Sequence, residues 1–433
     1  MYKFYIETLG CNKNQVDSEK MAGVLINHGL NITDDSADAD IVIINTCAFI
    51  NDAKEEAIET IFQAVTNKTE NQKIFVTGCF AQRYHGSILD EIPEVDGVMG
   101  VGDISLIIDL VEQKSNILLP DYSEDKIYDR VISNYPGWVY IKISDGCSNN
   151  CSYCTIPLIR GPLRSRSIES IIEEVLRLKT LHIKEYILIS QDTANYGFDV
   201  FGRIKLPELI NRISENIDED AKIRVLYMHP DHIDKTLLDE LKNNNKFIPY
   251  FDIPFQSGSD RILKKMGRRN SSSDNLALVR QIRQKFPENT IRSTFICGFP
   301  GEDEQDHLAT LNFIKSADID WLGGFKYSKE ENTVAYNYKP FVSERIKQRR
   351  LDQIIKLSEE MTTVRLQRFL GTIQKVLIEE RVAEDNLYIG RIWTQAPEVD
   401  GLTVVEGDNL PIGGIITAEI RNVNGNDYFA VAL

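Results

Sequence analysis

The sequence lacks any apolar run close to the roughly 20 residues that a helix needs to cross a bilayer. Its longest such run, residues 41–50, is interrupted by Asn45 and Thr46. The first residues lead directly into a strand-like pattern and lack the charged-then-apolar plan of a secretory signal. These absences predict a cytoplasmic protein without membrane segments.

An excess of basic residues is also missing. The 433-residue chain has 49 Lys and Arg against 65 Asp and Glu, which gives a formal net charge of −16. Nucleic-acid-binding proteins usually carry a basic footprint, and the chain as a whole has none. The acidity favours a basic partner through charge complementarity, with an acidic surface that only maintains solubility as the alternative.

Cysteine is scarce, and its count of seven is odd. An odd count without an export signal argues against a disulfide framework and favours metal binding or catalysis. Cys297 lies in an apolar stretch and is expected to pack in a core. His229 and His232 form an H-x-x-H pattern, but Pro230 places it in a loop without a clear third ligand. We therefore expect these histidines to be exposed or to pack in a pocket.

Three segments differ in hydrophobic pattern. Residues 1–125 alternate short apolar strands with helical stretches, which predicts a parallel α/β domain with helices on both faces of the sheet. Residues 135–368 hold six further strand–helix units, enough for a partial (β/α)6 barrel of the TIM type. Residues 371–433 are rich in Val, Ile and Thr with Gly and Asn turns, which indicates a small β-barrel. The polar residues 121–137 are interpreted as a linker.

The expected strands can be given by position. In the first segment they are residues 2–8, 41–45 and 74–77. In the central segment they are residues 139–143, 186–190, 223–227, 250–253, 291–297 and 322–327. A charged amphipathic helix over residues 343–369 leads to the last segment.

Cys147, Cys151 and Cys154, called the loop trio below, form a C-x3-C-x2-C pattern in a polar loop after an expected strand. Thiolates suit both zinc and iron–sulfur clusters, but a structural zinc site takes four protein ligands. No fourth Cys or His lies nearby. Three thiolates on a four-iron cluster leave one iron open, where the amine and carboxylate of a methionine-like molecule can bind. The alternative is three unrelated cysteines in one loop.

Cys11, Cys47 and Cys79, called the sheet trio below, come at the ends of three successive expected strands, 36 and 32 residues apart. The carboxyl ends of parallel strands share one rim, where ligands bind. Gly10 and Gly78 permit tight turns before two of these cysteines. We therefore expect the sheet trio to converge on one ion or cluster, with three buried cysteines as the alternative.

The loop trio, with Tyr153 before its third cysteine, resembles the cluster motif of the radical S-adenosylmethionine superfamily. The resemblance implies that Tyr153 packs near the adenine of the cofactor, with ordinary packing as the alternative. Residues 298–301 resemble the loop that approaches the cofactor's methionine and ribose, although a turn at a strand end has the same pattern. The pocket implied in this way is lined by Tyr153, Gln191, Gln256, Gly298, Phe299, Pro300 and Gly301.

Two three-cysteine sets, one N-terminal and one in a partial barrel, are together similar to the methylthiotransferases. The similarity covers nearly the whole chain: residues 10–19, 45–50 and 77–84 resemble the three blocks around the sheet trio. Asn12 is a departure, because proline is expected there. The last segment resembles the TRAM domain, a substrate-binding β-barrel.

The resemblance implies two 4Fe–4S clusters, one on each trio, with no catalytic residue beyond the cluster ligands. The loop cluster would bind S-adenosylmethionine and reduce it to a 5′-deoxyadenosyl radical, which takes a hydrogen from the substrate. The sheet cluster would present sulfur, and another cofactor molecule would supply the methyl group. An external electron donor and a sulfur donor are implied, and whether the sulfur comes from the cluster or from an external sulfide stays open.

Two branches of methylthiotransferases differ in substrate: an adenosine of transfer RNA, or the β-carbon of an aspartate in small-subunit ribosomal protein number twelve. Residues 190–197 and 390–401 resemble the ribosomal-protein branch. Residues 371–433 hold four basic and ten acidic side chains, a net charge of −6, which repels RNA and attracts a basic protein. We expect the ribosomal protein or the small subunit as partner, and no transfer RNA. Transfer-RNA modification and a non-catalytic iron–sulfur or zinc protein of ribosome assembly are the alternatives.

Overall fold

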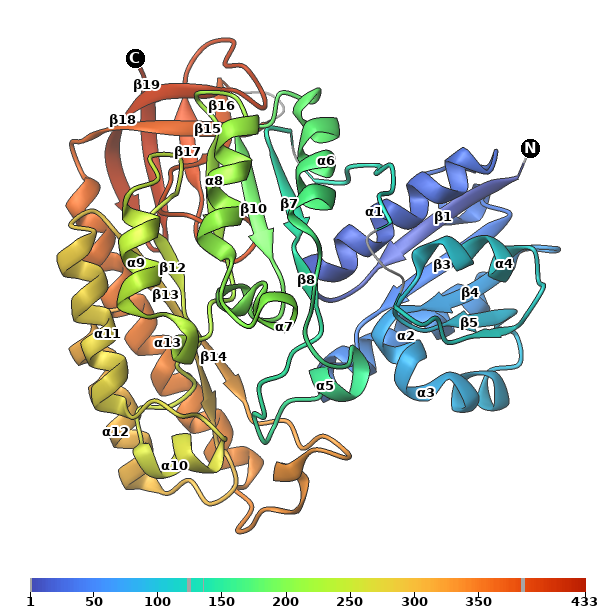
Figure 1. The fold of residues 1–433 in the computed structure, drawn as a ribbon, viewed down its shortest axis with the longest axis horizontal. Coiled ribbons are helices and arrows are strands. Elements are labelled where there is room, and N and C mark those ends of the chain that lie inside the picture. The colour runs from blue at the N-terminus through green and yellow to red at the C-terminus, as the bar shows by residue number, and fades with distance from the viewer. Residues whose placement is uncertain (1, 123–125, 135, 383–385) are drawn as a thin grey trace.

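A computed structural model of the chain describes residues 2–122, 126–134, 136–382 and 386–433. The described residues form an N-terminal parallel sheet, an open row of six parallel strands with outer helices, and a closed C-terminal barrel (Figure 1). This architecture confirms the predicted fold class. Within the described ranges, the structure contains no helix of the length and apolar character that crossing a membrane requires.

The N-terminal domain is a six-stranded parallel sheet with the order β2-β1-β3-β4-β5-β6. Its strands are β1 (Lys3–Thr8), β2 (Asn31–Ile32), β3 (Ile41–Thr46), β4 (Lys73–Thr77), β5 (Gly97–Met99) and β6 (Ile117–Leu118). Its helices are α1 (Asn12–Asn27), α2 (Asn51–Thr66), α3 (Gly78–Glu91) and α4 (Ile107–Val111). Ile41 and Ile43 pack with α1 and α4, while Val42 and Ile44 pack with α2 and α3. Helices therefore cover both faces of the sheet, as the alternating pattern predicted.

The central domain is a row of parallel strands in two hydrogen-bonded groups, β11-β10-β7 and β12-β13-β14. The strands are β7 (Trp138–Lys142), β10 (Glu185–Ile189), β11 (Lys222–Val225), β12 (Tyr250–Asp252), β13 (Thr290–Cys297) and β14 (Trp321–Lys326). The outer helices are α6 (Ile168–Lys179), α8 (Leu206–Asn216), α9 (Lys235–Lys242), α11 (Ser272–Lys285), α12 (Glu304–Ala317) and α13 (Glu344–Leu366). The shorter elements are β8 (Ser144–Asp145), β9 (Arg164–Ser165), α5 (Ile156–Ile159), α7 (Phe198–Phe201) and α10 (Asp260–Lys265).

Alternation along the central strands separates two cores. On β7, Val139 and Ile141 pack with the outer helices, whereas Trp138 and Tyr140 face the inside of the partial barrel. Cys297, at the end of β13, is 1% exposed and packs with the outer core, which confirms its predicted place. The strand row is thus a partial barrel with a filled interior.

The C-terminal barrel is closed in the order β15-β16-β17-β19-β18 and lies at the amino ends of the central strands (Figure 1). Its strands are β15 (Ile373–Arg381), β16 (Leu387–Arg391), β17 (Thr403–Glu406), β18 (Ile415–Asn424) and β19 (Asp427–Ala432). Between β16 and β17, residues 393–400 form what we call the floor segment. The hydroxyl of Tyr140 donates to Glu398 at 2.9 Å, and that of Tyr250 donates to Asp400 at 2.6 Å. The floor segment therefore packs against the inner side chains of the partial barrel.

The stretch predicted to be a polar linker, residues 121–137, is anchored to both neighbouring domains. Nε of Arg130 donates to Glu19 on α1 at 3.1 Å, and Nη1 donates to Glu174 on α6 at 2.6 Å. All three side chains are at most 3% exposed, so this stretch fastens α1 to α6 as well as connecting them. Residues 123–125 and 135 of the predicted linker lie outside the described residues.

Candidate active site

The sheet trio lies at the carboxyl edge of β1, β3 and β4, which are adjacent in the sheet. Cys11 directly precedes α1, Cys47 follows β3, and Cys79 is the second residue of α3. Strand β4 ends at Thr77, so Cys79 lies in the first turn of α3 and not at the strand end itself. A side-chain carbon on Gly10, whose φ is +89°, would overlap Cβ of Cys47 and lie 2.9 Å from its sulfur. Glycine therefore allows the first two cysteine loops to meet.

Burial and neighbouring charges shift the pKa values of all three thiols of the sheet trio. Burial, and after it the charges of Cys11 and Cys79, raise the pKa of Cys47 to about 12. Burial also raises the pKa of Cys79, against the opposing charge of Arg160. At Cys11 burial acts in the same direction, but Lys13 and Arg160 outweigh it and lower the pKa. Metal binding requires these thiols as thiolates, and a cationic cluster would compensate their mutual repulsion.

The loop trio is anchored by backbone hydrogen bonds to two other segments. The backbone N–H of Cys147 donates to the carbonyl of Gly161 at 3.1 Å. The backbone N–H of Ser152 donates to the carbonyl of Met266 at 2.9 Å. The backbone N–H of Asn149 points at the sulfur of Cys147 at 3.5 Å. Burial raises the pKa of Cys147 to about 11. The loop thus holds three thiols within eight residues, and one of its backbone N–H groups points at a thiol sulfur.

The donor set and its spacing fit clusters better than single zinc ions. All seven cysteines are free. In neither trio, both of which lie within the described residues, do all three sulfur atoms approach within 4.8 Å of one another. A tetrahedral zinc ion with Zn–S bonds of about 2.3 Å would hold its sulfur ligands about 3.8 Å apart. Soft thiolates, three per site and more widely spaced, suit iron–sulfur clusters.

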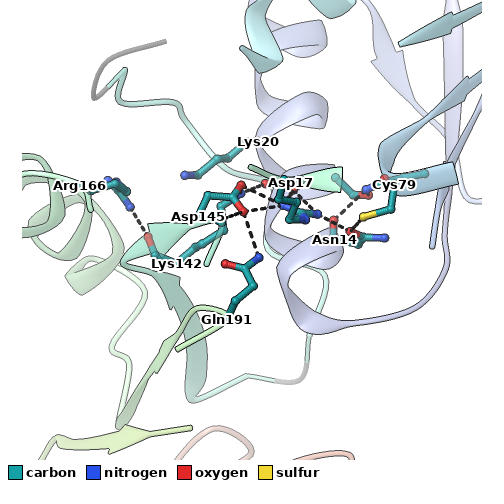
Figure 2. A network of polar contacts seen from close by, with 12 residues as sticks. Asn14, Asp17, Lys20, Cys79, Lys142, Asp145, Arg166 and Gln191 are labelled. Carbon is teal, nitrogen blue, oxygen red and sulfur yellow. Dashed lines mark hydrogen bonds and ion pairs between the residues drawn. The ribbon is translucent and has the colours of Figure 1, made fainter. Parts of the chain in front are cut away.

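Arg160, directly after α5, connects the two trios through a buried polar network. Its guanidinium donates to Oδ1 of Asn14 at 2.7 Å and to the two carboxylate oxygens of Asp145 at 3.2 and 2.9 Å. Oδ1 of Asn14 lies 3.9 Å from the sulfur of Cys79, and Asp145 stands two residues before Cys147. Figure 2 shows Asn14, Asp145 and Cys79 directed toward this network from the two domains. One buried cation thus lies between the supports of both trios.

Two predicted pocket residues, Tyr153 and Phe299, lie together beside the loop trio. The hydroxyl of Tyr153 accepts from Nη2 of Arg268 at 2.9 Å, and its ring meets that of Phe299 edge-on at 6.4 Å. Phe299 is fully buried and also packs on Tyr327 and Tyr338. Phe299 is therefore covered by aromatic rings, whereas Tyr153 keeps part of its side chain exposed.

The turn from Gly298 to Gly301 follows β13, and its glycines have φ values of 75° and 83°. A side chain on Gly298 would overlap Cγ of Lys347, and one on Gly301 would lie 2.5 Å from Nζ of Lys265. Turn geometry and these two lysines account for both glycines within the protein itself. Pro300 is buried in the same turn.

Gln191 and Gln256 follow β10 and β12 on the same rim. Each carries a buried side-chain oxygen that has no hydrogen-bond partner among the described residues. The amide nitrogen of Gln191 donates to Asp145 at 3.0 Å, while the backbone of Gln256 bridges to Phe295 of β13. Because buried acceptors are normally satisfied, two free oxygens at one rim fit the donors of a bound cofactor.

The H-x-x-H residues lie beside the loop trio and Arg268. Nε2 of His229 faces Arg268 at 2.5 Å and the sulfur of Cys151 at 3.9 Å. Burial, and after it the charge of Arg268, lower the pKa of His229 to about 2. His232 pairs with Asp192 at 2.7 Å. The ligand atoms of these two histidines and Asp192 lie within 4.8 Å, but the guanidinium at His229 disfavours a second cation.

Sequence reasoning missed three buried cations of the site, Lys13, Arg160 and Arg268. Their importance depends on partners that the fold brings from distant segments. The only local signal is that Lys13 lies two residues after Cys11 and Arg160 six residues after Cys154.

Comparison with known families divides the chain into three matches. Residues 3–100 match the family described as "Uncharacterized protein family UPF0004", and residues 141–314 match the Radical SAM superfamily. Residues 370–433 match the TRAM domain.

Curated relatives match over almost the full chain. The "Ribosomal protein uS12 methylthiotransferase RimO" of Thermotoga maritima is 42% identical, with 98% of each chain covered. The protein of the same name from Clostridioides difficile is 39% identical over 100% of this chain and 99% of its own.

Solved structures support the fold. The radical S-adenosylmethionine methyltransferase TsrM from Kitasatospora setae has a TM-score of 0.58 at 13% identity, covering 77% of this chain and 76% of its own. The cobalamin-dependent S-adenosylmethionine radical enzyme OxsB has a TM-score of 0.54 at 12% identity, covering 84% of this chain and 57% of its own.

The partial barrel with its three-cysteine loop defines the class of the protein, a radical S-adenosylmethionine enzyme. The chain belongs to the methylthiotransferase family whose curated members are named RimO. The predicted enzyme class and the predicted cofactors, S-adenosylmethionine and two 4Fe–4S clusters, are confirmed by this membership.

Proposed function

We propose that this chain methylthiolates the β-carbon of an aspartate in the small-subunit ribosomal protein uS12. The loop trio holds the cluster that binds S-adenosylmethionine, and the sheet trio holds the second cluster. The arrangement that carries the proposal is the pair of three-thiol sites joined through Arg160, Asn14 and Asp145. Joining two such sites through one buried network suits a reaction in which carbon activation and sulfur delivery take place side by side.

The side chains around the loop trio bind and orient the cofactor in this proposal. When bound to the cluster, S-adenosylmethionine supplies the one-electron chemistry that removes a hydrogen atom from the substrate. Tyr153 packs beside the adenine, and the free oxygens of Gln191 and Gln256 accept hydrogen bonds from the cofactor. The turn formed by Gly298, Phe299, Pro300 and Gly301 closes the methionine and ribose side. These groups exclude water and hold the cofactor toward the substrate.

Charge supports a basic protein substrate. The whole chain has a net charge of −16, and its C-terminal barrel is acidic. Such a surface steers a basic ribosomal protein toward the enzyme and repels the phosphates of transfer RNA. The curated relatives carry the uS12 substrate in their name. The proposal further includes a cytoplasmic location, an external electron donor and a sulfur donor.

The proposed domain bounds are residues 1–125, 135–368 and 371–433. The first sheet ends with β6 at Leu118, and α13 with its short 3-10 extension ends at Phe369. The barrel begins at Ile373.

A substrate assay tests the proposed function. Reconstituted enzyme is incubated without oxygen with reductant, S-adenosylmethionine and sulfide, and with purified uS12 or small ribosomal subunits. Mass spectrometry should find one methylthio group on a single aspartate of uS12, and none on transfer RNA in a parallel reaction. Modification of transfer RNA would move the chain to the other branch. Absence of 5′-deoxyadenosine with every substrate would indicate a non-catalytic protein.

A further inference from the structure

Lys13 is a buried lysine without a carboxylate partner among the described residues. It is the second residue of α1 and lies two residues after Cys11, and it is 8% exposed. Its ammonium lies 3.4 Å from the centroid of the Tyr227 ring. No carboxylate of the described residues comes within 4.0 Å of its Nζ to form an ion pair.

Other buried lysines of the chain have anionic neighbours. Lys20 lies 3.9 Å from Glu174, and Lys347 lies 2.6 Å from Glu344. Lys142 pairs with Asp145 at 3.3 Å. A buried cation is costly unless an anion lies near it, so the absence of a carboxylate beside Lys13 requires a reason.

The aromatic face under Lys13 holds the ammonium without neutralising it. A cation over a tyrosine ring gains modest electrostatic energy, but its three N–H donors and its unit charge remain available. Tyr227 is itself fixed: its hydroxyl donates to Oδ1 of Asn12 at 3.1 Å, and its carbonyl accepts from the amide of Thr193 at 3.0 Å. The ammonium is therefore held in place and ready for an anion.

The position of Lys13 lies between the two halves of the site. On one side, Lys13 lies in the first turn of α1, and this helix begins directly after Cys11, which is its N-cap and the first thiol of the sheet trio. On the other side, Tyr227 follows β11 on the rim where Gln191 and Gln256 follow their strands. An anion paired with Lys13 would thus lie between the sheet trio and the cofactor pocket.

We propose that Lys13 binds the side-chain carboxylate of the target aspartate. This inference rests on the proposed function and adds the group that recognises the substrate. The β-carbon of aspartate is bonded directly to its carboxylate carbon, so an ion pair at Lys13 fixes the reacting carbon next to the sheet trio. The cofactor also has a carboxylate, and the experiment separates these two sources.

Binding of two substrates to three enzymes tests the proposal. The holoenzyme, its Lys13→Met variant and a Lys20→Met control are titrated with uS12 and with uS12 carrying asparagine at the target position. Lys20 is a matched control because it lies on the same helix and is 5% exposed. The wild type and Lys20→Met should bind the aspartate form at least about tenfold more tightly, as expected for a charge-assisted hydrogen bond. Lys13→Met should bind both forms equally, and Lys13→Arg should restore the preference.

Further readouts distinguish the possible outcomes. Lys13→Met should retain the iron content, the electron paramagnetic resonance spectra and the S-adenosylmethionine affinity of the wild type. Lost iron with an intact preference would assign Lys13 to the cluster, and lost cofactor affinity would assign it to the cofactor carboxylate; either result overturns the proposal. The proposal is also overturned if the wild-type enzyme binds the aspartate and asparagine forms of uS12 equally. This result does not depend on whether the Lys13→Met variant folds. If the wild type modifies no aspartate at all, the proposed function itself fails.

Discussion

The loop trio and the sheet trio bring three thiols together in opposite ways. The loop trio lies within residues 147–154 and is held by a few backbone bonds to neighbouring loops. The sheet trio is spread over residues 11–79, and its thiols meet only because β1, β3 and β4 are adjacent and parallel. The first site depends on local anchoring, whereas the second depends on the cooperative stability of a whole domain. The loop trio can therefore be recognised from its local cysteine spacing. The sheet trio can be recognised only from the order of the strands in the sheet.

Replacement of one cysteine in each trio should have the largest effect on iron content and activity. It should also show that the two trios hold separate clusters. The wild type should hold about eight irons, and Cys147→Ala and Cys79→Ala should each lose about half, because each removes one of three ligands. Cys147→Ala should form no 5′-deoxyadenosine, whereas Cys79→Ala should still form it without methylthiolated product. Iron analysis, electron paramagnetic resonance and mass spectrometry measure these outcomes. About four irons in the wild type, or zinc instead of iron, would contradict two separate clusters.

Replacement of Arg160 tests whether the two trios share one support. Arg160→Met removes one of the two cations beside Asp145 and Asp17, because Lys142 pairs with both, so the free energy of unfolding should fall by about 1.5–3 kcal/mol. Arg177→Met is the control, because Arg177 is 46% exposed and its exposed ion pairs contribute about 0.5 kcal/mol or less. Urea unfolding of the two apoproteins measures the difference. Equal stability of Arg160→Met and the control would show that the trios are supported independently.

Replacement of Cys297, the cysteine outside both trios, should have the smallest effect on stability and none on iron content. Cys297→Ala removes one buried sulfur from the core of the partial barrel, where it contacts neither trio. Its expected cost is about 1 kcal/mol of stability, with unchanged iron content and activity. Thermal unfolding and iron analysis check both parts. Loss of iron in this variant would mean that the cysteines do not divide into two trios and one core residue.

Hydrophobic periodicity was enough to predict the long elements of the fold. All six central strands occur with bounds shifted by at most two residues from those expected. The two-residue strands β2 and β6 were not predicted, because so short a segment carries no period.

The features that the sequence did not predict have one cause in common. They depend on contacts between segments that are distant in the sequence. Arg130 lay in a presumed linker, although two buried glutamates on different helices hold it. The glycines of the turn after β13 also have a reason within the fold, because Lys347 fills the space beside Gly298. Lys13 could not be recognised, because its burial and its lack of a carboxylate partner among the described residues are visible only in the folded chain.

The floor segment has a consequence for how this protein could have diversified. Glu398 and Asp400 of the C-terminal barrel are bonded to Tyr140 and Tyr250 inside the partial barrel. A gene fusion that joined a foreign terminal barrel to this chain would leave those two tyrosines without their acceptors. A foreign barrel must therefore supply acceptors at these two positions or leave two buried hydroxyls unpaired, at a cost of about 1–3 kcal/mol each.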